Sequence, residues 1–257
     1  MSGKGLVKRL ASRRGRARAG CFPAEGVRLV EEVLDSGWTV DFLAYTGLAA
    51  ANLRTANLLA RARARGLDPV LLDERRMKAL SGTVTPQGVL AMVRRPEDAW
   101  TDLLRRTISL VVVLDGLQDP GNVGTVIRAA DAAGCDGVVC LAGTSDPFGP
   151  KAVRASMGSV LHLPVYTGAK APDVAAGLAA HQVQLLVADP EGGRVLAEQD
   201  LRGPVALILG SEARGPGPSW QGQEVCRVRI PMPGRAESLN VALAAGIILY
   251  ETVRQRS

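Results

Sequence analysis

Apolar and polar positions in the first third of the chain alternate between helical and strand spacing. Val27, Val30 and Leu34 recur on one side of a predicted helix that Gly37 ends, and acidic residues take the other side. Further strands and helices are predicted in chain order at 40–45, 49–65, 69–72, 73–80 and 88–93. Helices and strands that alternate over so few residues indicate α/β layering in a compact unit.

The pattern changes after residue 107. Residues 108–114 form an apolar, largely β-branched run without a polar face, which predicts a strand in a sheet covered on both sides. Similar runs predict strands at 138–141, 185–188 and 205–209, with helical segments between them such as 122–133 and 172–181. This alternation predicts a mostly parallel sheet with helices on both faces. Residues 225–230 alternate instead, which predicts a less buried face, and a last helix is expected over 237–254.

Length and composition agree with two folded domains. The chain has 257 residues, of which 47% are hydrophobic, so it can bury two cores and is not disordered as a whole. We place an N-terminal domain at 21–93, a charged linker at 94–106 and a second domain at 107–257. No apolar run is long enough for a membrane span and no secretory signal is recognised, so we expect a cytoplasmic protein without membrane contact. Scattered cysteines and histidines predict reduced thiols and no metal site.

The positive charge of the chain is concentrated at its start. Residues 1–20 contain seven lysine and arginine side chains and no acidic residue, whereas the whole chain has a net charge of +6, so residues 21–257 sum to −1. A basic arm of this kind is typical of proteins that bind the phosphate backbone of nucleic acid. A solubilising tail is the alternative interpretation.

Ligands of open parallel sheets bind at the carboxyl ends of the strands, and the loop that follows residue 114 carries suitable residues. Asn122 is a good helix cap, and Arg128 lies six residues further on, near the positive end of the predicted helix. A guanidinium there is well placed to hold an anion such as a phosphate. An ordinary strand–helix turn with a surface arginine fits the same spacing equally well.

Two later loops also follow predicted strands. Residues 209–217 carry Glu212 between glycines, and residues 230–240 place two prolines and a glycine before Ser238 and Asn240. Serine and asparagine are also common caps at helix starts, which is the simpler explanation of both. The glycine-rich turn at 121–124 is not the GxGxxG of a dinucleotide-binding fold, and the chain has neither a P-loop nor a GxSxG nucleophile elbow.

These loops lie within three longer motifs, which read LDGLQDPGNVGTVIRAADAAG, ALILGSEARGPG and RIPMPGRAESLNVALAAGIILYE. In this order and spacing they resemble the motifs of the SPOUT methyltransferases of the SpoU/TrmH type, and the resemblance covers about residues 108–254. The N-terminal unit resembles the small α/β/α RNA-binding substrate domain that is often fused to ribosomal RNA enzymes of this family, most clearly in the segment SGTVTPQGVLAMV at 81–93.

The resemblance implies an enzyme that methylates a ribose 2′-hydroxyl of RNA with S-adenosylmethionine as the methyl donor. It also implies a trefoil knot in the C-terminal part of the sheet domain, and a homodimer with active sites at the subunit interface. The implied donor contacts are Leu209, Gly210, Gly215, Ile230, Met232 and Leu239, and the implied catalytic residues are Asn122, Arg128, Glu212, Ser238 and Asn240.

A ribose hydroxyl is a weak nucleophile, so the enzyme must align the reacting atoms and help the proton leave. The family resemblance implies the second task for Arg128. Phosphate anchoring and alkoxide stabilisation are the alternative for a guanidinium, which normally stays charged. We expect 23S-type ribosomal RNA as the substrate because an RNA-binding domain precedes the catalytic one. A tRNA substrate, or a non-catalytic RNA-binding or ribosome-assembly protein, is the alternative.

Overall fold

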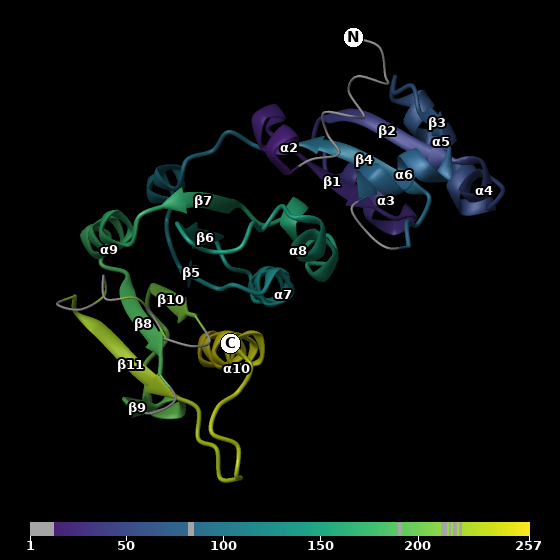
Figure 1. The fold of residues 1–257 in the computed structure, drawn as a ribbon. Helices are drawn as coiled ribbons and strands as arrows, with labels where there is room; N and C mark the ends of the chain where they lie inside the picture. The colour runs from purple at the N-terminus through teal and green to yellow at the C-terminus, as the bar shows by residue number, and fades with distance from the viewer. Residues whose placement is uncertain are drawn as a thin grey trace. The chain divides into compact units, whose positions relative to one another are not determined.

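The computed structural model describes residues 13–81, 85–189, 192–211, 215, 217, 220 and 223–257 (Figure 1). Contacts divide the chain into two compact units, Met1–Glu97 with Phe148–Leu161, and Asp98–Pro147 with His162–Ser257. The first unit therefore includes a segment from the sequence range that we assigned to the second domain. Among the residues that the structure describes, each unit has one β-sheet, and the second sheet is parallel with helices around it, which confirms the predicted α/β class. None of the helices in the described residues is long and apolar enough to cross a membrane.

The first unit contains a four-stranded sheet in the order β1-β4-β2-β3. Its strands are β1 (Cys21–Glu25), β2 (Val40–Thr46), β3 (Val70–Leu72) and β4 (Val89–Arg94). Strand β4 is antiparallel to both of its neighbours, and β3 is parallel to β2. The sequence did not predict β1, which contains Pro23. Because β1 is an edge strand, a residue without a backbone N–H is tolerated there.

The helices of the first unit are α2 (Arg13–Ala19), α3 (Val27–Asp35), α4 (Gly47–Ala50), α5 (Leu53–Ala64), α6 (Glu74–Ser81), α8 (Pro150–Ala155) and the 3-10 helix η2 (Ser159–Leu161). The single helix predicted at 49–65 is wrong: Asn52 accepts a hydrogen bond from the Arg54 N–H at 2.9 Å and starts a new helix. Part of the expected basic arm is helical, as α2, and residues 1–12 of it lie outside the described residues.

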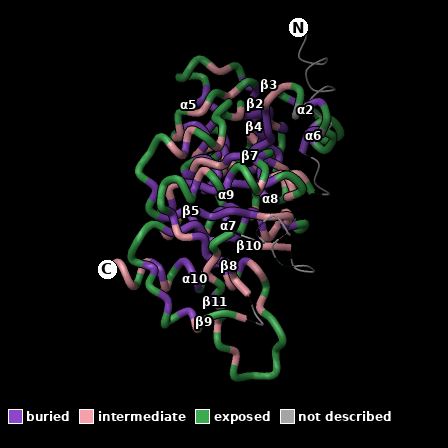
Figure 2. Tube along the Cα trace, turned by 90° about the vertical axis from the view of Figure 1, so that its left-hand side faces the viewer, coloured by how far each residue is buried: buried purple, intermediate pink, exposed green. Residues whose placement is uncertain are grey.

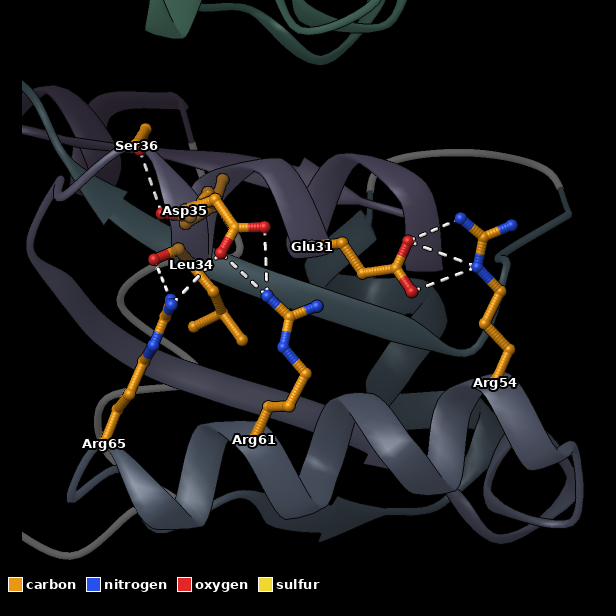
Figure 3. A network of polar contacts seen from close by, with 8 residues as sticks. Glu31, Leu34, Asp35, Ser36, Arg54, Arg61 and Arg65 are labelled. Atoms are coloured by element: carbon orange, nitrogen blue, oxygen red, sulfur yellow. Dashed lines mark hydrogen bonds and ion pairs between the residues drawn. The ribbon is translucent and has the colours of Figure 1, made fainter.

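Ion pairs join the exposed faces of α3 and α5 (Figure 3). Glu31 pairs with Arg54 at 2.5 Å, and Asp35 pairs with Arg61 at 2.7 Å and with Arg65 at 3.0 Å. Hydrogen bonds from the arginines lower the pKa of both carboxyl groups, Glu31 through Arg54 and Asp35 through Arg61 and Arg65. These arginines already have acidic partners, so this face of α5 is less suited to RNA phosphates than its arginine content suggests.

The second unit contains a seven-stranded sheet in the order β7-β6-β5-β10-β8-β11-β9, and every strand pair in it is parallel. Its strands are β5 (Leu110–Asp115), β6 (Gly137–Leu141), β7 (Val165–Ala169), β8 (Gln184–Ala188), β9 (Arg194–Val195), β10 (Val205–Gly210) and β11 (Val225–Arg229). The predicted buried strands are confirmed, since β5 and β10 are buried along almost their whole length (Figure 2). In β11, Val228 is buried and Arg227 and Arg229 are exposed, as the alternation predicts.

Helices cover the two faces of this sheet. The 3-10 helix η1 (Trp100–Arg105) and α9 (Ala171–Ala180) pack with Val111 and Val113 of β5 in one core cluster. Successive side chains of a strand point to opposite faces, so Val112 and Leu114 face the other layer. That layer contains α7 (Pro120–Ala132) and α10 (Val241–Arg256), which lie side by side against the sheet (Figure 1).

Hydrogen bonds join the last turn of α10 to the residues that precede β5 and β10. The Arg256 guanidinium donates to the carbonyl of Leu201 at 2.9 Å and to the carbonyl of Ser109 at 3.1 Å. The Gln255 amide donates to the carbonyl of Gln199 at 3.0 Å, and its oxygen accepts from the Leu201 N–H at 2.9 Å. The side chains of Gln255 and Arg256 therefore fix the C-terminal end of α10 to the sheet.

Candidate active site

A cavity of about 330 Å³ opens at the carboxyl ends of β10, β8 and β11. The structure brings all six predicted donor contacts together around it: Leu209, Gly210, Gly215, Ile230, Met232 and Leu239. Ser238 and Asn240, from the predicted catalytic set, line the same cavity. Most of the loop 230–240, which supplies five of these residues to the wall, is exposed (Figure 2). The three strand ends and the first turns of α10 thus form one concave site.

The wall of the cavity combines apolar side chains with backbone groups. Leu209, Ile230 and Met232 supply apolar surface, which suits a flat ring. Ser211 and Gly215 exchange backbone hydrogen bonds at 3.1 and 2.9 Å, and Gly215 has a φ of 64° that favours glycine. The cavity therefore fits an adenosine-like group held by main-chain polar groups. Glu212 lies outside the described residues.

The start of α7 differs from the prediction in one respect. Asp119, and not Asn122, caps the helix, because Pro120 occupies the first helical position and the Asp119 carboxylate accepts from the N–H groups of Gly121 and Asn122. The prediction that Asn122 is the cap is wrong. Asn122 is instead the third residue of α7, and its Oδ1 accepts a hydrogen bond from Asn240 Nδ2 at 3.1 Å.

Asn240 uses both ends of its amide. Its Oδ1 accepts from the Ala242 N–H at 2.9 Å and from the Leu243 N–H at 3.4 Å, so Asn240 is the N-cap of α10. Its Nδ2 donates to Asn122, a residue 118 positions earlier in the chain. The final helix therefore starts at Val241 and not at 237. The two contacts fix the orientation of the amide and join the first turns of α7 and α10 at the edge of the cavity.

Arg128 lies on an exposed face of α7 and does not line the cavity. No hydrogen bond or ion pair links its guanidinium to another residue in the described part of the chain. An unengaged guanidinium on the helix that carries Asn122 is available to an external anion. Neither Arg128 nor Ser238 is held by the network that fixes Asn122 and Asn240.

Sequence reasoning missed several residues that position these loops. The Asp115 carboxylate, at the end of β5, accepts from the Gly217 N–H at 2.7 Å and from Trp220 Nε1 at 2.8 Å, which ties β5 to the loop after β10. The Gln118 amide donates to the carbonyls of Gly116 at 2.8 Å and Gly143 at 2.9 Å. An aspartate or a glutamine in a loop after a strand is an ordinary loop residue, so no local pattern marks its partners, most of which lie tens of residues away.

The sequence profile of the SpoU rRNA methylase family matches residues 109–250, and that of the MRM3-like substrate binding domain matches residues 6–91. The 23S rRNA (uridine(2479)-2′-O)-methyltransferase of Streptomyces viridochromogenes is 35% identical over 96% of this chain and 87% of its own length. The 23S rRNA (guanosine(2553)-2′-O)-methyltransferase of Bacillus subtilis is 34% identical, over 95% of this chain and 92% of its own.

The similarity extends to three dimensions. The structure of the SpoU methyltransferase AviRb from Streptomyces viridochromogenes, in complex with AdoMet, superposes with a TM-score of 0.88 at 31% identity. The match covers 100% of this chain and 98% of AviRb. Since the family profile spans more than half of the chain and the relatives align along nearly all of it, this chain belongs to the SpoU rRNA methylase family.

Proposed function

We propose that this protein transfers the methyl group of S-adenosylmethionine to a ribose 2′-hydroxyl of 23S-type ribosomal RNA. The observation that carries the proposal is the cavity at the three strand ends, which gathers all six expected donor contacts, with the Asn122–Asn240 pair at its edge. Both full-length relatives named above are 23S rRNA 2′-O-methyltransferases, which favours ribosomal RNA over tRNA. With ribosomal RNA as the substrate, we infer a cytoplasmic location.

The cavity residues would hold the donor in a fixed orientation. Ile230, Met232 and Leu239 would enclose the adenine ring, while the backbone at Gly210 and Gly215 would bind its polar edges. When bound, the donor supplies a methyl group on a positively charged sulfur, which is reactive toward a suitably placed oxygen. The protein's own task is therefore to align that oxygen and to lower the cost of removing its proton.

Arg128 and the asparagine pair would divide this task. The Arg128 guanidinium would anchor a substrate phosphate and stabilise negative charge as it develops on the 2′-oxygen. The hydrogen bond between Asn122 and Asn240 would hold the first turns of α7 and α10 together, so that the distance between the phosphate site and the donor cavity stays constant. Glu212 and Ser238 complete the proposed set as residues that position the donor and the loop.

A direct assay tests the function. Purified protein should methylate in vitro transcripts of 23S ribosomal RNA domains in the presence of S-adenosylmethionine, and ribose-methylation mapping should locate one modified nucleotide. Total tRNA serves as the competing substrate. Preferential methylation of tRNA would replace the proposed substrate, and donor binding without transfer to either RNA would support the non-catalytic alternative.

We include a trefoil knot in the proposal. It is supported by the long return of the chain from β10 through β11 to α10, which packs against α7 from the beginning of the same unit. The loops after β10 and β11, between which a knotted segment would pass, both contribute to the cavity. A knot there would hold the donor-binding loops in place without relying on side-chain contacts alone.

We also propose a homodimer in which α10 contacts a second copy of the chain. Leu243, Ile247 and Tyr250 follow one stripe of α10 and are 62%, 42% and 70% exposed. We expect Leu243→Glu combined with Tyr250→Glu to halve the mass measured by sedimentation velocity, because charges on the stripe would have to be desolvated in the interface. Leu53→Glu, at a 76% exposed leucine of α5, is the matched control. An unchanged mass in the α10 variant would place the interface elsewhere.

The basic N-terminal segment is expected to strengthen RNA binding through phosphate contacts. Deleting residues 1–20 removes seven positive charges. Each lost phosphate contact lowers the slope of log affinity against log salt by about 0.7–0.9, so the deletion should weaken binding and flatten this slope. Filter binding of 23S transcripts over a salt series measures both. Donor affinity should not change, and an unchanged salt slope would mean that the segment is only a solubilising tail.

A further inference from the structure

Asp189 is the one charged side chain among the described residues that line the cavity. It follows directly after β8, and its side chain is 21% exposed. Its carboxylate accepts from Arg227 Nη1 at 2.7 Å and from the Gly192 N–H at 3.2 Å. These donors fix the orientation of the carboxylate in a wall that is otherwise apolar or neutral.

The neighbouring strand and the turn after Asp189 bring Arg227 close to the Asp189 carboxylate. Arg227 lies on β11 and pairs in register with Val187 of β8, so its side chain reaches Asp189 from the neighbouring strand. Gly193 has a φ of 85°, and a Cβ atom there would lie 2.2 Å from the Arg227 carbonyl oxygen. Only glycine allows the turn after Asp189 to approach β11 this closely. Because the Arg227 side chain is 50% exposed, the ion pair stabilises the fold little, and fold stability alone does not explain the arrangement.

The strand order places Asp189 in the middle of the proposed donor site. Strand β8 lies between β10 and β11, and β5, which leads into α7, lies beyond β10. A donor with its adenine on the loop 230–240 and its sulfur directed toward α7 has its ribose between them, at the end of β8. A ribose presents two neighbouring hydroxyl donors, and a carboxylate is a strong acceptor for hydroxyl hydrogen bonds.

We propose that Asp189 binds the ribose hydroxyls of S-adenosylmethionine and that Arg227 positions its carboxylate for this contact. The inference rests on the proposed function, which places the donor in this cavity. An aspartate that instead faced the sulfonium would interact with the positive charge of the donor and not with its hydroxyls. The two arrangements differ in a measurable way, since S-adenosylhomocysteine has the same ribose but a neutral sulfur.

Isothermal titration calorimetry with three ligands tests the proposal on the full-length protein: S-adenosylmethionine, S-adenosylhomocysteine and the 2′,3′-dideoxy analogue of S-adenosylhomocysteine. Asp189→Ala should weaken the first two equally, by about 10- to 100-fold, the range expected for hydrogen bonds to a charged group. The dideoxy analogue should bind wild type weakly, because it lacks the hydroxyls that Asp189 would accept from. For the same reason, Asp189→Ala should not weaken its binding further. Arg227→Gln, which keeps the carboxylate, should give a smaller loss.

Asp200→Ala is the matched control, because Asp200 is also an aspartate paired with an arginine, Arg202 at 2.9 Å, and it does not line the cavity. Its affinities should equal those of wild type. The proposal would be overturned if removing the ribose hydroxyls from S-adenosylhomocysteine lowered its affinity by the same factor in wild type and in Asp189→Ala. It would also be overturned if Asp189→Ala weakened the binding of S-adenosylmethionine alone. Failure of the cavity assignment itself would look different: Ala244→Phe, which fills the cavity, would then leave binding of S-adenosylhomocysteine unchanged.

Discussion

Replacing Asn240 by serine is expected to lower methyl transfer at least about 100-fold while the fold keeps its stability, the loss expected when an aligned hydrogen-bond donor is removed from an active site. Serine is as good an N-cap as asparagine, so the contacts to the N–H groups at the start of α10 can be kept. A serine hydroxyl is too short to keep the 3.1 Å hydrogen bond to Asn122. The variant therefore separates the role of the amide in catalysis from its role in the helix.

Asn240→Ala is the companion variant. It should lose the same activity and, in addition, about 1 kcal/mol of stability, because alanine cannot cap α10. Activity is measured by transfer of labelled methyl groups to the mapped RNA, and stability by urea unfolding followed by circular dichroism. Wild-type turnover in the serine variant would remove Asn240 from the proposed site and leave it as a helix cap only.

Arg128→Ala is expected to reduce kcat/KM by about 100- to 1,000-fold, the size of effect seen when a charge-stabilising donor is removed from an active site. Stability should change by less than about 0.5 kcal/mol, because the side chain is exposed and makes no contact that packing depends on. Arg105→Ala, at a side chain that is 81% exposed in the same unit, is the control for loss of a surface arginine.

Arg128→Lys then distinguishes the two roles considered for this residue. A lysine keeps the positive charge but not the planar fork, so a phosphate anchor should lose affinity for RNA and retain its pH profile. If the side chain takes the proton, the pH dependence of kcat should instead move with the lower pKa of lysine. A variant with wild-type kinetics would exclude Arg128 from both roles.

The sequence by itself determined the layers of the second unit. The run at 108–114 has no polar face, and the structure buries β5 from both sides, because such a strand is stable only where both faces are covered. The three motifs also predicted the family, and the family profile confirms it. The assignment of Arg128, Glu212 and the other site residues stays a prediction until the variants are measured.

Only the tertiary structure decided which side chains meet. Asn122 reads as a helix cap in the sequence, yet Asp119 takes that position and Asn122 contacts Asn240 instead. Asp189 has no local signature at all, because it is defined by Arg227 on a neighbouring strand and by a cavity that three strand ends share. Hydrophobic periodicity reflects which side of an element is buried, which is a local property. A hydrogen bond between residues 118 positions apart depends on the strand order of the whole sheet, and no local pattern contains that information.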